Sequence, residues 1–275
     1  MINTVFSLFV FYFSVLVCLY YFYVYILSLI NQINNLKEQV KNFNNNESDT
    51  KIINGLFEVH VTIDPENDFV KLLSFVKEHE NDKSFKLVFA VSSEKNNQYM
   101  LSYFSNKTSE EKAIESANNV AKDMTEFGLK VVRVKVESHN MKDVPQTVKD
   151  YEIYSLNMSD KYKPYFEFHV KIFSNKYNAK YKYNELNDHI ITNDIVIGSS
   201  LPQNSYSIAI SHNICSRNKK PILTIRIYNN GYVDALVIKD LILNSYKVNG
   251  FVFDDTIQQE FAVFDSCPEL DSGWL

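Results

Sequence analysis

The chain has 275 residues, with 28 Lys and Arg against 33 Asp and Glu, which gives a formal net charge of -5. This acidic balance argues against general nucleic-acid binding, because such proteins neutralise phosphates with an excess of Lys and Arg. Hydrophobic residues make up 45% of the chain, and it contains only six Gly and six Pro, so the composition is that of a packed globular protein and excludes low-complexity or collagen-like chains.

The first 30 residues carry the signal of a membrane anchor. Residues 5–30 read VFSLFVFYFSVLVCLYYFYVYILSLI and contain no charged residue, Gly or Pro. A helix rises about 1.5 Å per residue, so about 20 apolar residues cross the hydrocarbon core of a bilayer. A cleaved signal peptide is the alternative, but it would have a basic start, a shorter apolar core and a small-residue cleavage site. We therefore expect residues 1–30 to be a transmembrane anchor whose partner is the lipid bilayer, through residues 5–30.

Residues 31–53 are expected to be a linker or stalk, because NFNNNESDT within them has the composition of a flexible spacer. Lys37 and Lys41 lie after the apolar run, whereas no basic side chain precedes it, and this favours a cytoplasmic position for the C-terminal side of the membrane segment. The three Cys lack the spacing of a metal site or a disulfide framework, which suits a reducing compartment. We expect a single-pass membrane protein with a cytoplasmic globular region.

An internal repeat organises the rest of the chain. The segment FEVHVTI at residues 57–63 recurs as FEFHVKI at residues 166–172, and both alternate apolar and polar residues as strands with two different faces do. Helix and strand patterns follow each copy in the order βαββαβ, which is the split βαβ arrangement of ferredoxin-like folds. We expect an α+β fold with repeat 1 at residues 54–139, a connection at 140–163, and repeat 2 with a C-terminal tail at 164–275.

The expected elements run in the same order in both copies. In repeat 1, strands are expected at 57–63, 85–91, 98–104 and 129–137, and helices at 66–80 and 109–127. Thr108 with Glu111 fits a capping box at the start of the second helix, and Gly128 is placed to end it. The connection is expected to be exposed, because Pro145 lies among charged residues. In repeat 2, strands are expected at 165–173, 206–214, 221–228 and 257–265, and helices at 183–192 and 232–248.

In a βαββαβ unit both helices cover one face of the sheet. Phe57 and its alternate neighbours should therefore pack beneath the helices, which leaves Glu58, His60 and Thr62 on the other face. In the second copy that face carries Glu167, His169 and Lys171, and the adjacent strands add Arg133, Lys135, Glu137, Thr224, Arg226 and Glu260.

Such a polar face could hold a phosphate or carboxylate through charge-assisted hydrogen bonds, with His for proton transfer near neutral pH. We predict His60, Thr62 and His169 as catalytic candidates. The anion-binding candidates are Arg133, Lys135, Lys171 and Arg226. In the alternative interpretation the two polar faces pack together, with Glu–Arg pairs and hydrogen-bonded His between them.

The strand His60-Val61-Thr62 resembles the His-x-Thr/Ser element of two-histidine phosphoesterases, duplicated enzymes that cleave cyclic phosphates or 2',5' linkages. The second copy reads His169-Val170-Lys171, with Lys where that family has a hydroxyl residue. The whole chain also resembles the uncharacterised membrane-anchored proteins of large amoebal DNA viruses of the mimivirus group, in its Asn-, Lys-, Ile- and Tyr-rich composition and its apolar N-terminal run. That second resemblance implies no activity.

Two functions are inferred as hypotheses. The first is a membrane-anchored, non-enzymatic binding or structural module, whose partner would be a protein or a small anionic ligand. The alternative is a phosphoesterase-like enzyme that acts on cyclic or 2',5'-linked nucleotides through His60 and His169. No cofactor or metal is expected, since the other histidines, His139 among them, lack metal-ligand spacing and are expected to be solvated or in turns. Asp265, Glu269 and Asp271 could bind a cation, although capping of a short helix explains two of them.

Overall fold

The computed structural model describes residues 52–64, 69–79, 84–91, 97–156, 158, 162–175, 205–213, 221–248 and 250–271. All of them belong to one compact unit, which lies within Thr50–Leu275. The predicted membrane segment at residues 5–30, most of the predicted linker and the predicted helix at 183–192 lie outside the described residues. Within the described ranges, no helix has both the length and the apolar character that crossing a bilayer requires.

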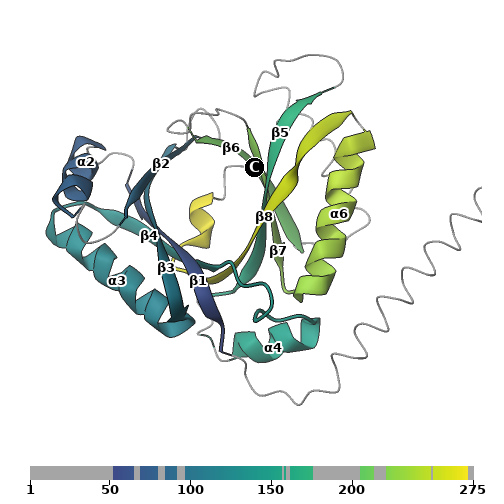
Figure 1. The fold of residues 1–275 in the computed structure, drawn as a ribbon, viewed down its shortest axis with the longest axis horizontal. Helices are drawn as coiled ribbons and strands as arrows, with labels where there is room; N and C mark the ends of the chain where they lie inside the picture. Colours follow the sequence, from purple (N-terminus) through teal and green to yellow (C-terminus); the bar gives the residue numbers. More distant parts are fainter. Residues whose placement is uncertain are drawn as a thin grey trace, which may run out of the picture. The chain divides into compact units, whose positions relative to one another are not determined.

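Eight antiparallel strands form a closed barrel (Figure 1). The strands run around the barrel in the order β1-β3-β2-β6-β7-β5-β8-β4. Each half of the unit contributes four adjacent strands, and β2–β6 and β4–β8 pairing joins the two halves. The bounds are β1 (Asn54–Ile63), β2 (Lys86–Val91), β3 (Asn97–Ser109), β4 (Val131–Ser138), β5 (Tyr165–Asn175), β6 (Tyr206–Asn213), β7 (Ile222–Tyr228) and β8 (Phe251–Asp265).

Helices cover the outside of the barrel. They are α2 (Phe69–Glu78), α3 (Glu110–Glu126), α4 (Val148–Leu156) and α6 (Tyr232–Val248), and the short 3-10 helix η1 (Pro268–Asp271) follows β8. In Figure 1, α2 and α3 flank one side of the barrel and α6 flanks the other. Helix α3 packs on β1, β3 and β4, and α6 packs on β5, β7 and β8. The buried face of α3 recurs every three or four residues, at Ala113, Ala117, Val120 and Met124.

The two strands that carry the repeated motif have an apolar outer face and a polar inner face. On β1, Phe57, Val59, Val61 and Ile63 belong to the hydrophobic core between barrel and helices. On β5, Phe166, Phe168, Val170 and Ile172 do the same. Alternation along a strand then places the intervening polar residues on the other face, as the sequence predicted, and in the closed barrel this face lines the lumen.

The C-terminal end of α3 is as the sequence predicted, and the N-terminal end is not. Gly128 follows the helix with φ of +88°, a left-handed conformation that favours Gly, and it ends the helix as predicted. The predicted capping box is wrong, because the N-cap is Ser109, which makes no side-chain capping bond. Thr108 instead belongs to β3, where it pairs with Gly55 of β1.

The connection between the halves is exposed at most of its described charged residues, as predicted, but it is packed at other positions and Pro145 is buried rather than exposed. It contains α4, and both Val144 and Tyr151 are buried. The Tyr232 backbone N–H at the start of α6 donates to Pro145 O at 2.9 Å. A Cβ atom on Gly231 would lie 2.3 Å from the backbone carbon of Thr147, so only Gly allows this approach.

Candidate functional site

The barrel encloses a cavity of about 280 Å³, lined by alternate residues of all eight strands. The lining residues of β1, β4 and β5 are almost all charged or polar, whereas β2, β3 and β6 supply small and apolar side chains as well. A cavity of this size approaches the lower limit of small-molecule sites, at roughly 300 Å³. The barrel therefore presents a small site with one strongly charged side.

Arg133 of β4 holds the C-terminal end of the described chain against the barrel. Its guanidinium donates to Asp265 through Nε at 2.8 Å and through Nη2 at 2.5 Å, and to Asp271 of η1 through Nη1 at 2.7 Å. The Tyr165 hydroxyl donates to Asp265 at 2.6 Å, and the Gln98 amide donates to Asp271 at 2.6 Å. Asp265 and Asp271 thus both bind a cation of the chain itself, Arg133.

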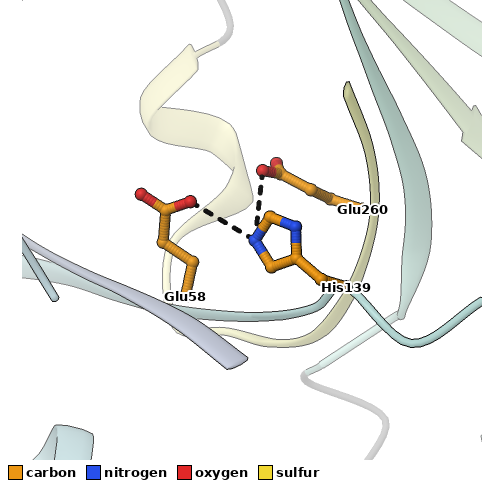
Figure 2. Close-up of side chains that lie close together, drawn as sticks. All are labelled: Glu58, His139 and Glu260. Carbon is orange, nitrogen blue, oxygen red and sulfur yellow. Dashed lines mark ion pairs between the residues drawn. The ribbon is translucent and has the colours of Figure 1, made fainter. Parts of the chain in front are cut away.

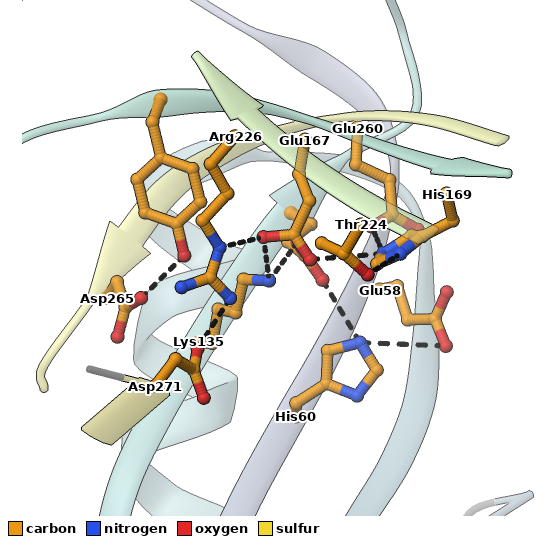
Figure 3. Close-up of polar contacts among 12 residues, drawn as sticks. Glu58, His60, Lys135, Glu167, His169, Thr224, Arg226, Glu260, Asp265 and Asp271 are labelled. Atoms are coloured by element: carbon orange, nitrogen blue, oxygen red, sulfur yellow. Dashed lines mark hydrogen bonds and ion pairs between the residues drawn. The ribbon is translucent and has the colours of Figure 1, made fainter. Parts of the chain in front are cut away.

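Glu167 links this group to the rest of the lumen (Figure 3). Its Oε2 accepts hydrogen bonds from Lys135 Nζ at 2.9 Å and from Arg226 Nε at 2.7 Å. Arg226 also pairs with Asp271 at 2.5 Å, and Lys135 also pairs with Glu137 at 2.5 Å. Each of these two cations, like Arg133, therefore contacts two carboxylates.

His60 and His139 lie among the carboxylates on the other side of the lumen. His60 Nε2 is 3.0 Å from Glu137 Oε2 and 3.8 Å from Glu58 Oε1. His139 follows β4, and its Nε2 lies between two carboxylates, 3.3 Å from Glu58 Oε2 and 3.6 Å from Glu260 Oε1 (Figure 2). Neither carboxylate is aligned for a hydrogen bond with that nitrogen.

His169 of β5 is held by three partners. Its Nε2 is 3.0 Å from Glu167 Oε1 and 3.2 Å from Glu260 Oε2, and its Nδ1 is 2.9 Å from Thr224 Oγ1. Burial alone would lower the pKa of His169, but the Glu260 and Glu167 carboxylates raise it to about 10. The imidazole is therefore cationic at neutral pH as long as both carboxylates face it.

The pKa values of the buried carboxylates Glu58 and Glu260 are shifted in opposite directions. Burial alone would raise the pKa of Glu58, but His139, His60 and the Ser102 hydroxyl lower it to about 2. Burial and the neighbouring Glu137 carboxylate raise the pKa of Glu260. Glu260 is therefore the member of the cluster for which negative charge is least well compensated.

The predicted catalytic candidates all line this one cavity. His60 and Thr62 reach it from β1, and His169 reaches it from β5. Thr62 is 1% exposed, and among the residues that the structure describes its hydroxyl has no hydrogen-bond partner. The structure thus brings the three residues together without showing what they do.

The predicted anion-binding candidates divide into two groups. Arg133, Lys135 and Arg226 are engaged with carboxylates of the lumen. Lys171 lines the cavity but has an exposed side chain. These three cations are already paired with carboxylates. The sequence prediction that they bind an anion did not include these partners.

Sequence reasoning expected His139 to be solvated or in a turn and gave no role to Gln98 or Tyr165. A signal for His139 did exist, because it continues the alternation of Arg133, Lys135 and Glu137 by one further step. Gln98 and Tyr165 gave no comparable signal, since their polar atoms meet η1 and β8 only in the folded chain.

Comparisons with known proteins do not indicate a function, so the function is inferred from the geometry of the site. No protein-family model matches the chain, and no curated protein matches it. One similar solved structure is a crystal structure described as that of a candidate chlorite dismutase, with 7% sequence identity and a TM-score of 0.29 over 80% of this chain and 100% of the other. A score that low supports no argument about fold or function.

Proposed function

We propose that this chain is a membrane-anchored, non-enzymatic binding module, and that its barrel lumen binds a small cationic ligand. The anchor is inferred from the uncharged run at residues 5–30. The cytoplasmic position of the barrel is inferred from Lys37 and Lys41, which follow that run. The ligand is inferred from the charges of the lumen.

We also infer that the two halves are a tandem duplication of a ferredoxin-like unit, at residues 54–139 and 164–275. Two observations support this. The strand order β4-β1-β3-β2 in the first half corresponds to β8-β5-β7-β6 in the second. The repeated motif lies on the equivalent strands β1 and β5, where Glu58 and His60 correspond to Glu167 and His169.

An excess of buried carboxylates is the observation that carries the ligand proposal. Among the described residues, four cations contact the buried acids of the lumen, namely Arg133, Lys135, Arg226 and the protonated imidazole of His169. Lys86 and Lys171 also line the cavity, but they are exposed and water screens them. The buried acids number six, namely Glu58, Glu137, Glu167, Glu260, Asp265 and Asp271.

A buried charge without compensation is costly, at several kcal/mol for each ion. His60 and His139 can balance the remaining excess when they are protonated, and a cationic ligand can balance it in their place. A small anion would add to the excess, because each inner Arg and Lys is already engaged. The lumen therefore favours a small cation over a phosphate or carboxylate.

The test compares ligands of opposite charge. A ligand that binds only the native state raises the midpoint of urea unfolding. The full chain in detergent micelles is unfolded with Co²⁺, propylamine or inorganic phosphate present. We expect at least one of the cations to raise the midpoint, and phosphate to leave it unchanged. Stabilisation by phosphate and by neither cation would overturn the proposal in favour of an anion-binding lumen.

A second candidate is the phosphoesterase-like enzyme, and one observation favours it: His60 and His169 reach the same cavity from equivalent strands. Two observations count against it. His60 forms an ion pair with Glu137, and Lys171 replaces the hydroxyl residue of the family pattern. The test is turnover of 2',3'-cyclic nucleotides by the full chain. Activity that His60→Ala and His169→Ala both abolish would support this enzyme, and an absence of turnover would exclude it.

A further inference from the structure

We propose that the lumen binds two divalent metal ions that share the carboxylate of Glu260. This inference rests on the proposed function and specifies its ligand. Two sets of donors meet there, Glu58 with His139 and Glu260, and Glu167 with His169 and Glu260. Within each set the donor atoms lie within 4.8 Å of one another.

Glu260 is placed to bridge the two sets. Its Oε1 faces His139 Nε2 at 3.6 Å, and its Oε2 faces His169 Nε2 at 3.2 Å. The two oxygens of one carboxylate therefore point to different imidazoles. Paired metal ions that share a ligand in this way are about 3.5–4 Å apart in hydrolytic and polymerising enzymes.

The distances between donors fit a coordination polyhedron. Metal bonds to imidazole nitrogen and carboxylate oxygen are about 2.0–2.2 Å long, so at angles of 90–110° two ligand atoms are roughly 3.0–3.5 Å apart. The four distances from nitrogen to oxygen are 3.3 and 3.6 Å around His139, and 3.0 and 3.2 Å around His169. An ion could enter either set with only small side-chain movements.

Unused polar atoms at the site are the second, independent observation. His139 Nε2 is buried between two carboxylates and makes no hydrogen bond among the described residues. Thr62 is 1% exposed and lines the cavity, and its hydroxyl likewise has no hydrogen-bond partner in the described chain. Buried polar groups are normally satisfied, so atoms left over in one place point to a missing ligand.

Outer contacts orient the donors, as they do in known metal sites. The Ser102 hydroxyl donates to Glu58 Oε1 at 2.7 Å, which leaves Oε2 facing His139. Lys135 and Arg226 hold Glu167 Oε2, which leaves Oε1 facing His169. Each flanking carboxylate thus has one oxygen fixed by the protein and the other directed at a histidine.

Thr224 can supply the equivalent outer contact for an imidazole. Its Oγ1 lies 2.9 Å from His169 Nδ1. When Nδ1–H donates to this hydroxyl, a metal ion that displaces the Nε2 proton binds the Nε2 lone pair, and the proton is released to solvent. One imidazole and two carboxylates in each set suit Zn²⁺, Co²⁺, Mn²⁺ or Fe²⁺ rather than a soft, thiolate-preferring ion.

Co²⁺ serves as the probe, because its visible absorption reports binding without any assay of activity. The full chain in detergent micelles is stripped with a chelator and dialysed against Co²⁺ at neutral pH. We expect two ions per chain. In Glu260→Gln, which lacks the shared carboxylate, we expect both to bind more than about 100-fold more weakly, because loss of even an outer contact weakens metal sites about 10–100-fold. Glu115→Gln, on the exposed face of α3, is the matched control and should bind as the natural chain does.

Two further variants keep the test informative if Glu260→Gln does not fold. His139→Gln and His169→Gln should each retain one ion and lose the other. Binding of a single ion to the natural chain, or unchanged binding by Glu260→Gln, would overturn the bridged pair. If propylamine stabilises the chain and Co²⁺ does not bind, the metal proposal fails while the cationic-ligand proposal stands. If neither binds, both fail.

Discussion

Replacement of Arg133 by Met tests the buried network of the lumen. Arg133 is 4% exposed and contacts both Asp265 and Asp271. Methionine keeps an unbranched chain but is shorter and has no charge, so the variant leaves two buried carboxylates without this partner. Removal of one member of a buried ion pair costs about 3–5 kcal/mol.

The remaining contacts determine where in that range the loss falls. Asp271 keeps Arg226 at 2.5 Å and Gln98 at 2.6 Å. Asp265 keeps the Tyr165 hydroxyl at 2.6 Å. Because both carboxylates retain donors, we expect the lower end, about 3 kcal/mol of the free energy of unfolding.

Urea unfolding of the full chain, followed by circular dichroism, measures this loss. With a slope of about 3 kcal/mol per molar urea, the midpoint should fall by about 1 M. Lys130→Met is the matched control, because Lys130 pairs with Asp64 at 2.5 Å but is 69% exposed, and exposed pairs contribute about 0–1 kcal/mol. If Arg133→Met loses no more stability than Lys130→Met, the ion pairs of the lumen do not hold the barrel together as described.

Three further predictions concern pH, a helix end and the outer core. The two arginine partners of Asp271 offset its burial and lower its pKa to about 2 from 3.8, so its carboxylate stabilises the native state above about pH 4 and this contribution is lost as pH falls towards 2. Asp271→Asn should therefore cost about 2 kcal/mol at neutral pH and much less at pH 2, as urea unfolding at both pH values would show; an equal loss at both would contradict this. Gly128→Ala should cost about 1–2 kcal/mol because φ is +88°, and Gly128→Asn less, with melting temperatures as the measurement; equal melting temperatures for the three chains would count against this explanation. Phe168→Ala removes a fully buried side chain and should cost about 3–5 kcal/mol in urea, whereas Phe104→Ala, at a position that is 50% exposed, should cost under about 0.5, and similar losses would contradict the assigned core.

The sequence predicted the two faces of the central strands because alternation is local. Phe57 to Ile63 and Phe166 to Ile172 carry the pattern in consecutive residues, and strand geometry alone turns it into an outer core and a polar lumen. Helix α6 is predicted with equal accuracy, at 232–248, because a long segment rich in apolar residues ends near Gly250. Helix α4 was missed because Tyr151 is its only fully buried residue, so it carries no apolar periodicity.

Closure of the barrel could not be predicted from the sequence. It depends on pairing of β2 with β6 and of β4 with β8, and backbone hydrogen bonds between edge strands impose no residue pattern. One extra residue in β8, between the partners of Val136 and Glu137, also shifts the phase of that strand. Asp265 therefore reaches the ion pairs of the lumen although alternation from Glu260 places it on the opposite face.

The composition of the candidate site followed from the sequence only in part. His60 and His169 could be placed in one polar region because the repeat relates them. The partners that neutralise Arg133 could not, because Asp265 and Asp271 are more than 100 residues away along the chain. Charge compensation is a property of the folded lumen, and it changed the expected ligand from an anion to a cation.

The position of a bound cation tests this account most directly. Crystals of the chain soaked in Zn²⁺ would locate the ion by its anomalous scattering. We predict peaks inside the barrel, at about 2.0–2.2 Å from Glu260 oxygens and from Nε2 of His139 and His169. Peaks confined to the outer surface, with an unchanged lumen, would contradict the account.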